Sequence, residues 1–106
     1  MNVLLDNCVP RPFGGRILGH NVTHASKRGW GRLANGVLLT AAADAGFEVM
    51  LTTDRSIEHQ QSSFPIPVVL IEALFNEVDD LVRYLPAVHA LLDQSLQPRM
   101  YVIPRI

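Results

Sequence analysis

Residues 46–54 read Gly-Phe-Glu-Val-Met-Leu-Thr-Thr-Asp, in which a helix end, a strand and a turn follow one another. Gly46 closes an apolar pattern of helical spacing. Residues 48–52 then have the apolar centre of a buried strand, and Thr53 and Asp54 form a polar turn. Near the start of the chain, Val3, Leu4 and Leu5 likewise form a short apolar run, which ends in the turn-forming pair Asp6-Asn7.

The same alternation of strands and helices extends over the whole chain. The apolar pattern predicts strands at 2–6, 21–24, 48–52, 67–71 and 100–103. It predicts helices at 10–18, 35–45, 55–61 and 78–92. Pro86 predicts a kink or two consecutive helices in the last of these, and Pro104 places the last strand at a sheet edge. This order favours a single α/β domain over residues 1–106, with a mainly parallel sheet and helices on both faces.

Composition limits the class of protein. The 106 residues suffice for one domain, and 48% hydrophobic against 18% charged residues allow a buried core. A net charge of −1 excludes a strongly basic nucleic-acid wrapper but leaves room for a local basic patch. The single cysteine, Cys8, excludes an internal disulfide framework and is expected to be a small buried residue. With no signal-peptide pattern and no apolar run of about 20 residues, the expected location is the cytoplasm, without membrane contact.

Acidic residues end or follow three of the predicted strands. Asp6 ends the first strand, whereas Asp54 follows the third and Glu72 follows the fourth. Functional sites in open parallel sheets gather at the carboxyl ends of strands, so Asp6 and Asp54 converge if their strands are neighbours. Close carboxylates repel each other unless a cation such as Mg²⁺ or Mn²⁺, which prefers oxygen ligands, lies between them. The spacing alone leaves open the alternative that both aspartates are turn and cap residues.

A predicted glycine-rich loop at residues 25–34 carries basic residues. Lys27 and Arg28 precede Trp30 in this loop. The group is interpreted either as a nucleic-acid contact, with Trp30 stacking on a base, or as a loop anchored by a half-buried tryptophan. Further positive charge at the strand-end edge would come from Arg11 and Arg55.

Four blocks of the sequence match a known pattern in order. They are a strand followed by Asp6-Asn7-x-x-Pro10; Gly29-Trp30 with Asn35-Gly36-x-Leu38-Leu39; Ala45-Gly46-Phe47-x-Val49-x-x-Thr52-Thr53-Asp54; and Gln60-Gln61. Together they resemble a family of small bacterial PIN-like proteins, and the resemblance spans nearly the whole chain. It implies a PIN-like fold, a three-layer α/β/α sandwich with a central parallel sheet. It also implies kinship with metal-dependent ribonucleases, including the toxins of toxin–antitoxin pairs.

The acidic cluster of that family is present only in part. By resemblance, Asp6 and Asp54 match acids that hold Mg²⁺ or Mn²⁺, and Asn35, expected to be a helix N-cap, falls in the block that opens the middle helix. Asn7 and Val37 stand where the family often has glutamate. Supporting or outer-shell roles are expected for Asn7, Asn35, Glu58, Gln60 and Glu72.

From these residues and this resemblance we expect one of two functions. The leading one is a toxin-like, metal-dependent ribonuclease with a depleted acidic site, in which Asp6 and Asp54 are both catalytic and metal-binding. The competing one is a non-catalytic PIN-like module that binds a cognate antitoxin-like protein or nucleic acid. A homodimer is the default expectation for a small α/β domain.

Overall fold

Five short strands form one sheet in the computed structural model, which describes residues 1–106. They are β1 (Asn2–Leu5), β2 (Asn21–His24), β3 (Val49–Thr52), β4 (Val68–Ile71) and β5 (Met100–Ile103). Every neighbouring pair is parallel, and the order across the sheet is β2-β1-β3-β4-β5. The five predicted strands are confirmed, and β5 lies at an edge as expected.

Four α-helices and three 3₁₀-helices connect the strands. They are η1 (Arg11–Arg16), η2 (Ala25–Arg28), α1 (Asn35–Asp44), α2 (Ile57–Gln60), α3 (Val78–Leu81), η3 (Val82–Tyr84) and α4 (Leu85–Leu92). The expected division of the last helix occurs at η3, and Pro86 lies in the first turn of α4, where its missing N–H costs little. The predicted helix at 10–18 is instead the 3₁₀-helix η1, because its prolines and glycines disfavour a longer α-helix.

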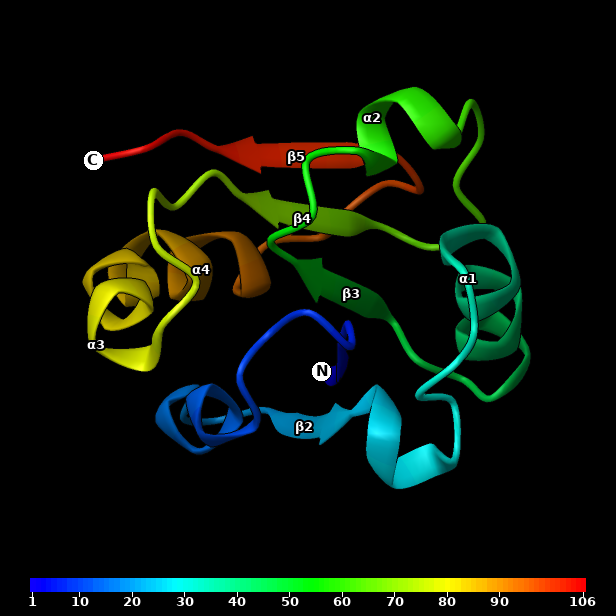
Figure 1. The fold of residues 1–106 in the computed structure, drawn as a ribbon, viewed down its shortest axis with the longest axis horizontal. Helices are drawn as coiled ribbons and strands as arrows, with labels where there is room; N and C mark the ends of the chain where they lie inside the picture. The colour runs from blue at the N-terminus through cyan, green and yellow to red at the C-terminus, as the bar shows by residue number, and fades with distance from the viewer.

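Helices cover both faces of the sheet (Figure 1). Side chains alternate between the faces along each strand, so Val3 and Leu5 join one core cluster while Leu4 joins the other. The first cluster includes residues of η1, α3, η3 and α4, and the second includes residues of α1 and α2. In Figure 1, α3 and α4 lie to the left of the sheet and α1 and α2 to the right. The three-layer α/β/α arrangement is thus confirmed.

Two expectations for the loops near the strand ends are wrong. Asn35 is the first residue of α1 and not its N-cap, which is the extended Ala34. Residues 25–28 form η2 and not an open loop. The helix can begin there because the ring of His24 accepts a hydrogen bond from the backbone N–H of Ser26 at 3.2 Å.

The expectation that Cys8 is buried is also wrong. Cys8 is exposed, although it closely follows a strand whose last three residues are buried. The reason is a tight turn directly after β1, in which the Val9 N–H donates to the Asp6 carbonyl at 3.0 Å. This turn returns Val9 to the core and leaves Cys8 on the outside.

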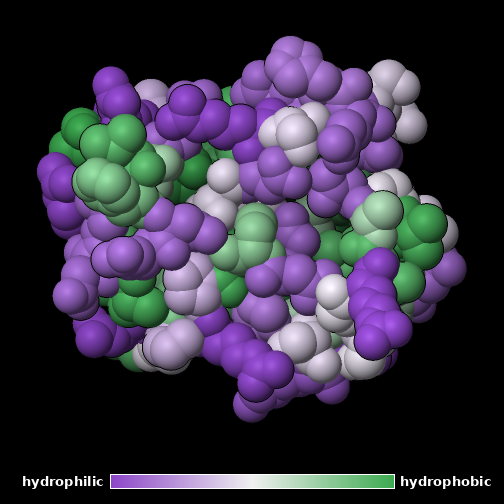
Figure 2. Space-filling view, viewed as in Figure 1, coloured by the Kyte–Doolittle hydropathy of each residue, from purple (hydrophilic) through white to green (hydrophobic).

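The surface seen in Figure 2 is mainly hydrophilic, with hydrophobic areas over α1 and beside α3. The large apolar side chains that remain exposed are Leu18, Val37, Leu74, Phe75, Val102 and Ile106. None of the helices combines the length and the apolar character that crossing a membrane requires.

Candidate functional site

The chain reverses its direction of travel across the sheet at β1. It passes from β1 to β2 on one side, and then continues with β3 on the other side of β1. In open parallel sheets, ligand sites form outside the carboxyl ends of the strands at such a switch point. Asp6 directly follows β1, and Asp54 lies two residues beyond β3. The two aspartates therefore follow the two strands that flank the switch point.

Thr52 links these two aspartates. Its buried hydroxyl donates to Asp6 Oδ2 at 2.7 Å and accepts from the backbone N–H of Asp54 at 3.1 Å. The strand register produces this contact, because the Asp6 N–H extends the β1–β3 ladder to the Leu51 carbonyl at 2.9 Å. One hydrogen-bond network thus contains the Asp6 carboxylate and the Asp54 backbone at the same edge of the sheet.

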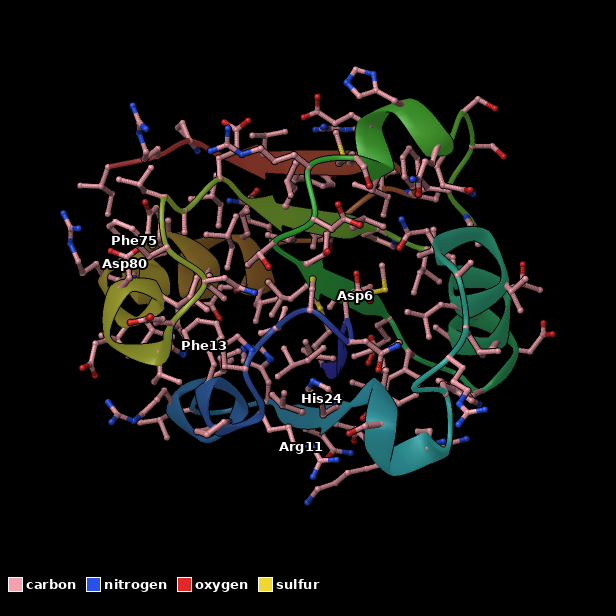
Figure 3. All side chains as sticks on the ribbon, viewed as in Figure 1. Asp6, Arg11, Phe13, His24, Phe75 and Asp80 are labelled. Atoms are coloured by element: carbon pink, nitrogen blue, oxygen red, sulfur yellow. The ribbon has the colours of Figure 1, made fainter.

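Asp6 is held in a fixed orientation by several donors. The residue is only 5% exposed, and Figure 3 shows it near the middle of the viewed side. Besides the Thr52 hydroxyl, the Asn7 N–H donates to Oδ1 at 2.7 Å and the Cys8 thiol lies 3.6 Å from Oδ2. These donors offset the cost of burying a carboxylate. A carboxylate offers about four acceptor positions, so at least one remains for a ligand.

Asn76, in the loop between β4 and α3, ties that loop to the residues around Asp6. Its side-chain Nδ2 donates to the backbone carbonyl of Cys8. The Thr53 hydroxyl lies 3.0 Å from Asn76 Oδ1 and 3.3 Å from the Cys8 sulfur. The loops that follow β1, β3 and β4 are therefore connected to one another at the site.

Asp54 is ionised more readily than an ordinary aspartate. The Ser56 hydroxyl donates to Asp54 Oδ1 at 2.7 Å, and this bond is the main reason that the pKa of Asp54 lies below its ordinary value of 3.8. Partial burial opposes the shift, whereas the Ser56 N–H and the nearby Asn35 amide lower the pKa further. Asp54 is therefore a carboxylate at neutral pH, and Oδ2 keeps its acceptor capacity because both Ser56 bonds go to Oδ1.

Replacing Ser56 by alanine is expected to raise the pKa of Asp54 towards 3.8, because the hydroxyl bond is lost while the backbone N–H stays. A depressed folded-state pKa adds stability above about pH 4, which is lost as the pH falls through the folded value. Titration of the Asp54 carboxyl carbon by NMR measures the shift, and Ser62→Ala, at an exposed serine, is the control. An unchanged midpoint in Ser56→Ala contradicts this account.

Asn35 and Asn7 use their amides to join loops around the site. Asn35 Nδ2 donates to Gln60 Oε1 at 2.7 Å, which connects the start of α1 to the end of α2. Asn7 Nδ2 donates to the backbone carbonyl of Trp30 at 3.0 Å. In both residues the amide NH₂ makes the contact, so the carbonyl oxygen Oδ1 stays available as an oxygen ligand.

The acidic candidates Glu58 and Glu72 are placed differently. Glu58 is exposed on α2 and makes no contact that ties it to the aspartates. Glu72 directly follows β4, and its backbone carbonyl accepts a hydrogen bond from Arg55 Nη2 at 3.2 Å. Arg55 thus extends from Asp54 towards the carboxyl end of β4. No group of three or more His, Cys, Asp and Glu side chains is arranged to hold a metal ion.

The basic residues divide into two groups. The Arg28 guanidinium lies 4.9 Å from the centre of the Trp30 ring, and the centres of the Trp30 and Phe47 rings are 6.0 Å apart in an edge-to-face arrangement. Trp30 is partly buried against the core, so its ring anchors the loop. Arg11 and Lys27 lie elsewhere, at a cleft beside β2.

Sequence reasoning assigned no role to several polar residues of this network. They are Thr52, Thr53, Ser56 and Asn76. The position of Thr52 at the end of a buried strand was a usable signal, because a buried hydroxyl needs a partner. Asn76 carries no such signal, since it is separated from its partner Cys8 by 68 residues.

Comparison of the chain with protein-family models, with curated proteins and with solved structures finds no match. The fold and the site define a parallel α/β/α sandwich with two linked aspartates at its switch point.

Proposed function

We propose that this chain is a PIN-like protein that uses Mg²⁺ or Mn²⁺ to hydrolyse phosphodiester bonds in RNA. The observation that carries the proposal is the pair of aspartates after β1 and β3, joined through the Thr52 hydroxyl at the switch point of the sheet. A buried carboxylate and an ionised one at this position form a negative edge suited to a hard cation.

The oxygen donors at this edge fit a weakly held divalent cation. Asp6 and Asp54 would supply the carboxylates, and Asn35 could add its amide oxygen. Mg²⁺ is commonly bound by one or two carboxylates together with waters and substrate phosphate. Two carboxylates are therefore sufficient if the RNA itself completes the coordination, and we expect the cation to bind more tightly with RNA than without it.

Different residues of the chain would have different roles in the hydrolysis. A bound cation would supply positive charge that neutralises phosphate oxygens and activates water. Thr52 keeps Asp6 oriented, and Ser56 keeps Asp54 ionised. Arg55, fixed near Glu72, would add a second positive charge for the phosphate. Water would attack phosphorus directly while the bond from phosphorus to the leaving ribose oxygen breaks; the attacking water gives up a proton and the leaving oxygen takes one up, so no covalent enzyme intermediate forms.

A second function is favoured by the small number of acids. No third His, Cys, Asp or Glu side chain joins the two aspartates in a group arranged to hold a metal ion, and Asn7 and Val37 stand where the resembled family often has glutamate. A non-catalytic PIN-like module would keep the same edge to bind nucleic acid or an antitoxin-like protein. For either function we place the protein in the cytoplasm, and a homodimer stays a prediction.

Cleavage of a mixed pool of single-stranded RNA tests the two functions against each other. Mn²⁺-dependent cleavage is expected, and Asp6→Asn or Asp54→Asn should slow it by at least about 100-fold, because loss of outer partners alone typically costs 10- to 100-fold. Asp44→Asn, at the exposed end of α1, is the matched control and should keep its activity. Absence of cleavage at every Mn²⁺ concentration, with the fold intact, supports the non-catalytic module.

A further inference from the structure

Charge is distributed unevenly along the chain. Residues 7–43 contain five of the nine Lys and Arg residues and none of the ten Asp and Glu residues. The remainder of the chain has four basic and ten acidic residues, so the two parts carry formal charges of +5 and −6. The positive segment forms η1, β2, η2 and most of α1. Although the net charge of the chain is near neutral, the β2 end of the sheet is therefore a basic region.

A cleft of about 380 Å³ opens in this basic region. Its lining includes Arg11, Gly14 and Gly15 of η1, together with His24 at the end of β2 and Lys27 of η2. Its volume falls within the range of about 300–1,000 Å³ that is typical of small-ligand sites. Figure 3 shows Arg11 and His24 at the lower part of the viewed side, beside β2.

The two cations at the cleft have no acidic partner. The ion pairs of the structure join other residues, Arg83 to Asp80 and His20 to Asp93. His24 cannot serve as a third ligand, because Nε2 lies 2.8 Å from the Val9 carbonyl and Nδ1 is engaged by Ser26. Arg11 and Lys27 are therefore the charged groups at the cleft that are free to bind an anion.

The cleft adjoins the edge that carries the aspartates. Leu5, the last residue of β1, lines the cleft, and the next residue in the chain is Asp6. Leu5 is also paired in register with His24, the last residue of β2. The cleft thus lies at the carboxyl ends of β1 and β2, one strand away from Asp54, which follows β3.

We infer that the Arg11–Lys27 cleft binds a backbone phosphate of single-stranded RNA, next to the bond that the aspartate edge would cleave. This assignment of the RNA path depends on the proposed function. A guanidinium and an ammonium that line the same open cleft match a phosphate, which accepts hydrogen bonds on several oxygens. The exposed backbone at Gly15, where no atom lies within 4 Å of an added Cβ, leaves room for the sugar.

Binding of a fluorescein-labelled single-stranded RNA 12-mer, measured by anisotropy in EDTA, tests this inference without any need for cleavage. Arg11→Gln and Lys27→Gln should each raise Kd about tenfold and reduce the slope of log K against log salt by about 0.7. Arg105→Gln, four strands away beyond β5, is the control for overall charge and should change Kd less than twofold.

Two glycines offer a second matched pair of variants. Gly15→Glu places a negative charge at the cleft and should weaken RNA binding about as much as Arg11→Gln. Gly31→Glu makes the same charge change outside the cleft, at a glycine whose Cβ would also meet no atom within 4 Å. Neither glycine has a positive φ, so the backbone tolerates both substitutions. Equal effects of the two glutamates overturn the inference.

The measurements of binding and of cleavage together test RNA binding at the cleft separately from the proposed nuclease activity. If RNA binding depends on Arg11 but no cleavage follows, the cleft is supported as a phosphate-binding site and the proposed nuclease activity is wrong. If the cleft variants leave cleavage unchanged, the nuclease activity is supported and only the assignment of the cleft as an RNA-binding site is wrong. Inorganic phosphate, a mononucleotide and polyglutamate serve as competitors, and the inference is overturned if polyglutamate displaces the RNA as effectively as unlabelled RNA does.

Discussion

Replacing Thr52 by valine is expected to lower the free energy of unfolding by about 2–4 kcal/mol. Valine has nearly the same shape, so the packing of the fully buried side chain is kept. The loss is one of hydrogen bonds. The Asp6 carboxylate, 5% exposed, loses one of its two donors at 2.7 Å, and the N–H of Asp54 loses its acceptor. A buried group left without a partner costs more than the hydrogen bond itself contributes.

Chemical denaturation at neutral pH measures this effect. Thr52→Ser keeps the hydroxyl and should lose no more than about 1.5 kcal/mol, as expected for removing one buried methyl group. Thr40→Val is the control, because the Thr40 hydroxyl bonds only to the Gly36 carbonyl on the exposed side of α1. If Thr52→Val is as stable as Thr40→Val, the Thr52 hydroxyl does not support the aspartate edge.

Replacing Leu4 by alanine is expected to cost about 2–5 kcal/mol. Leu4 is fully buried in β1, between β2 and β3, and it packs into the core cluster under α1 and α2. Truncation removes apolar area from that cluster and leaves a cavity in the centre of the sheet. Since domains of this size have total stabilities of about 5–15 kcal/mol, the loss is a large part of the whole.

Thermal and denaturant unfolding of Leu4→Ala should show the loss as a lower midpoint with a single transition. Leu18→Ala is the matched control, because Leu18 is 73% exposed and its backbone contact to His89 does not depend on the side chain. The control should stay within about 0.5 kcal/mol of the unmodified chain. Similar midpoints for the two variants would show that Leu4 does not pack as described.

The fold could be predicted from the sequence because its strands are short, apolar and bounded by clear turns. The run Val3-Leu4-Leu5 and the segment around Met50 are buried on both faces, which is the pattern of a parallel sheet. The 3₁₀-helices were harder to predict. Their hydrogen bonds are local, and η2 begins at a histidine side chain that is not among the usual capping residues.

The candidate site could be predicted in its position but not in its contacts. Parallel strands place their carboxyl ends together, so Asp6 and Asp54 were expected at one edge from sequence alone. The exposure of Cys8 and the contact of its carbonyl with Asn76 depend on how three loops meet. Such contacts join residues far apart in the chain, and no local pattern encodes them.

Because the basic part of the chain forms β2, at one edge of the sheet, and the 3₁₀-helices on either side of it, we expect the molecule to have a positive end at β2. A polyanion that diffuses towards it is turned so that it first meets the end of the sheet formed by β2, before any specific contact is made. The encounter rate with RNA should then fall steeply as ionic strength rises, although the protein as a whole is slightly acidic. Long-range orientation of this kind does not require a high isoelectric point.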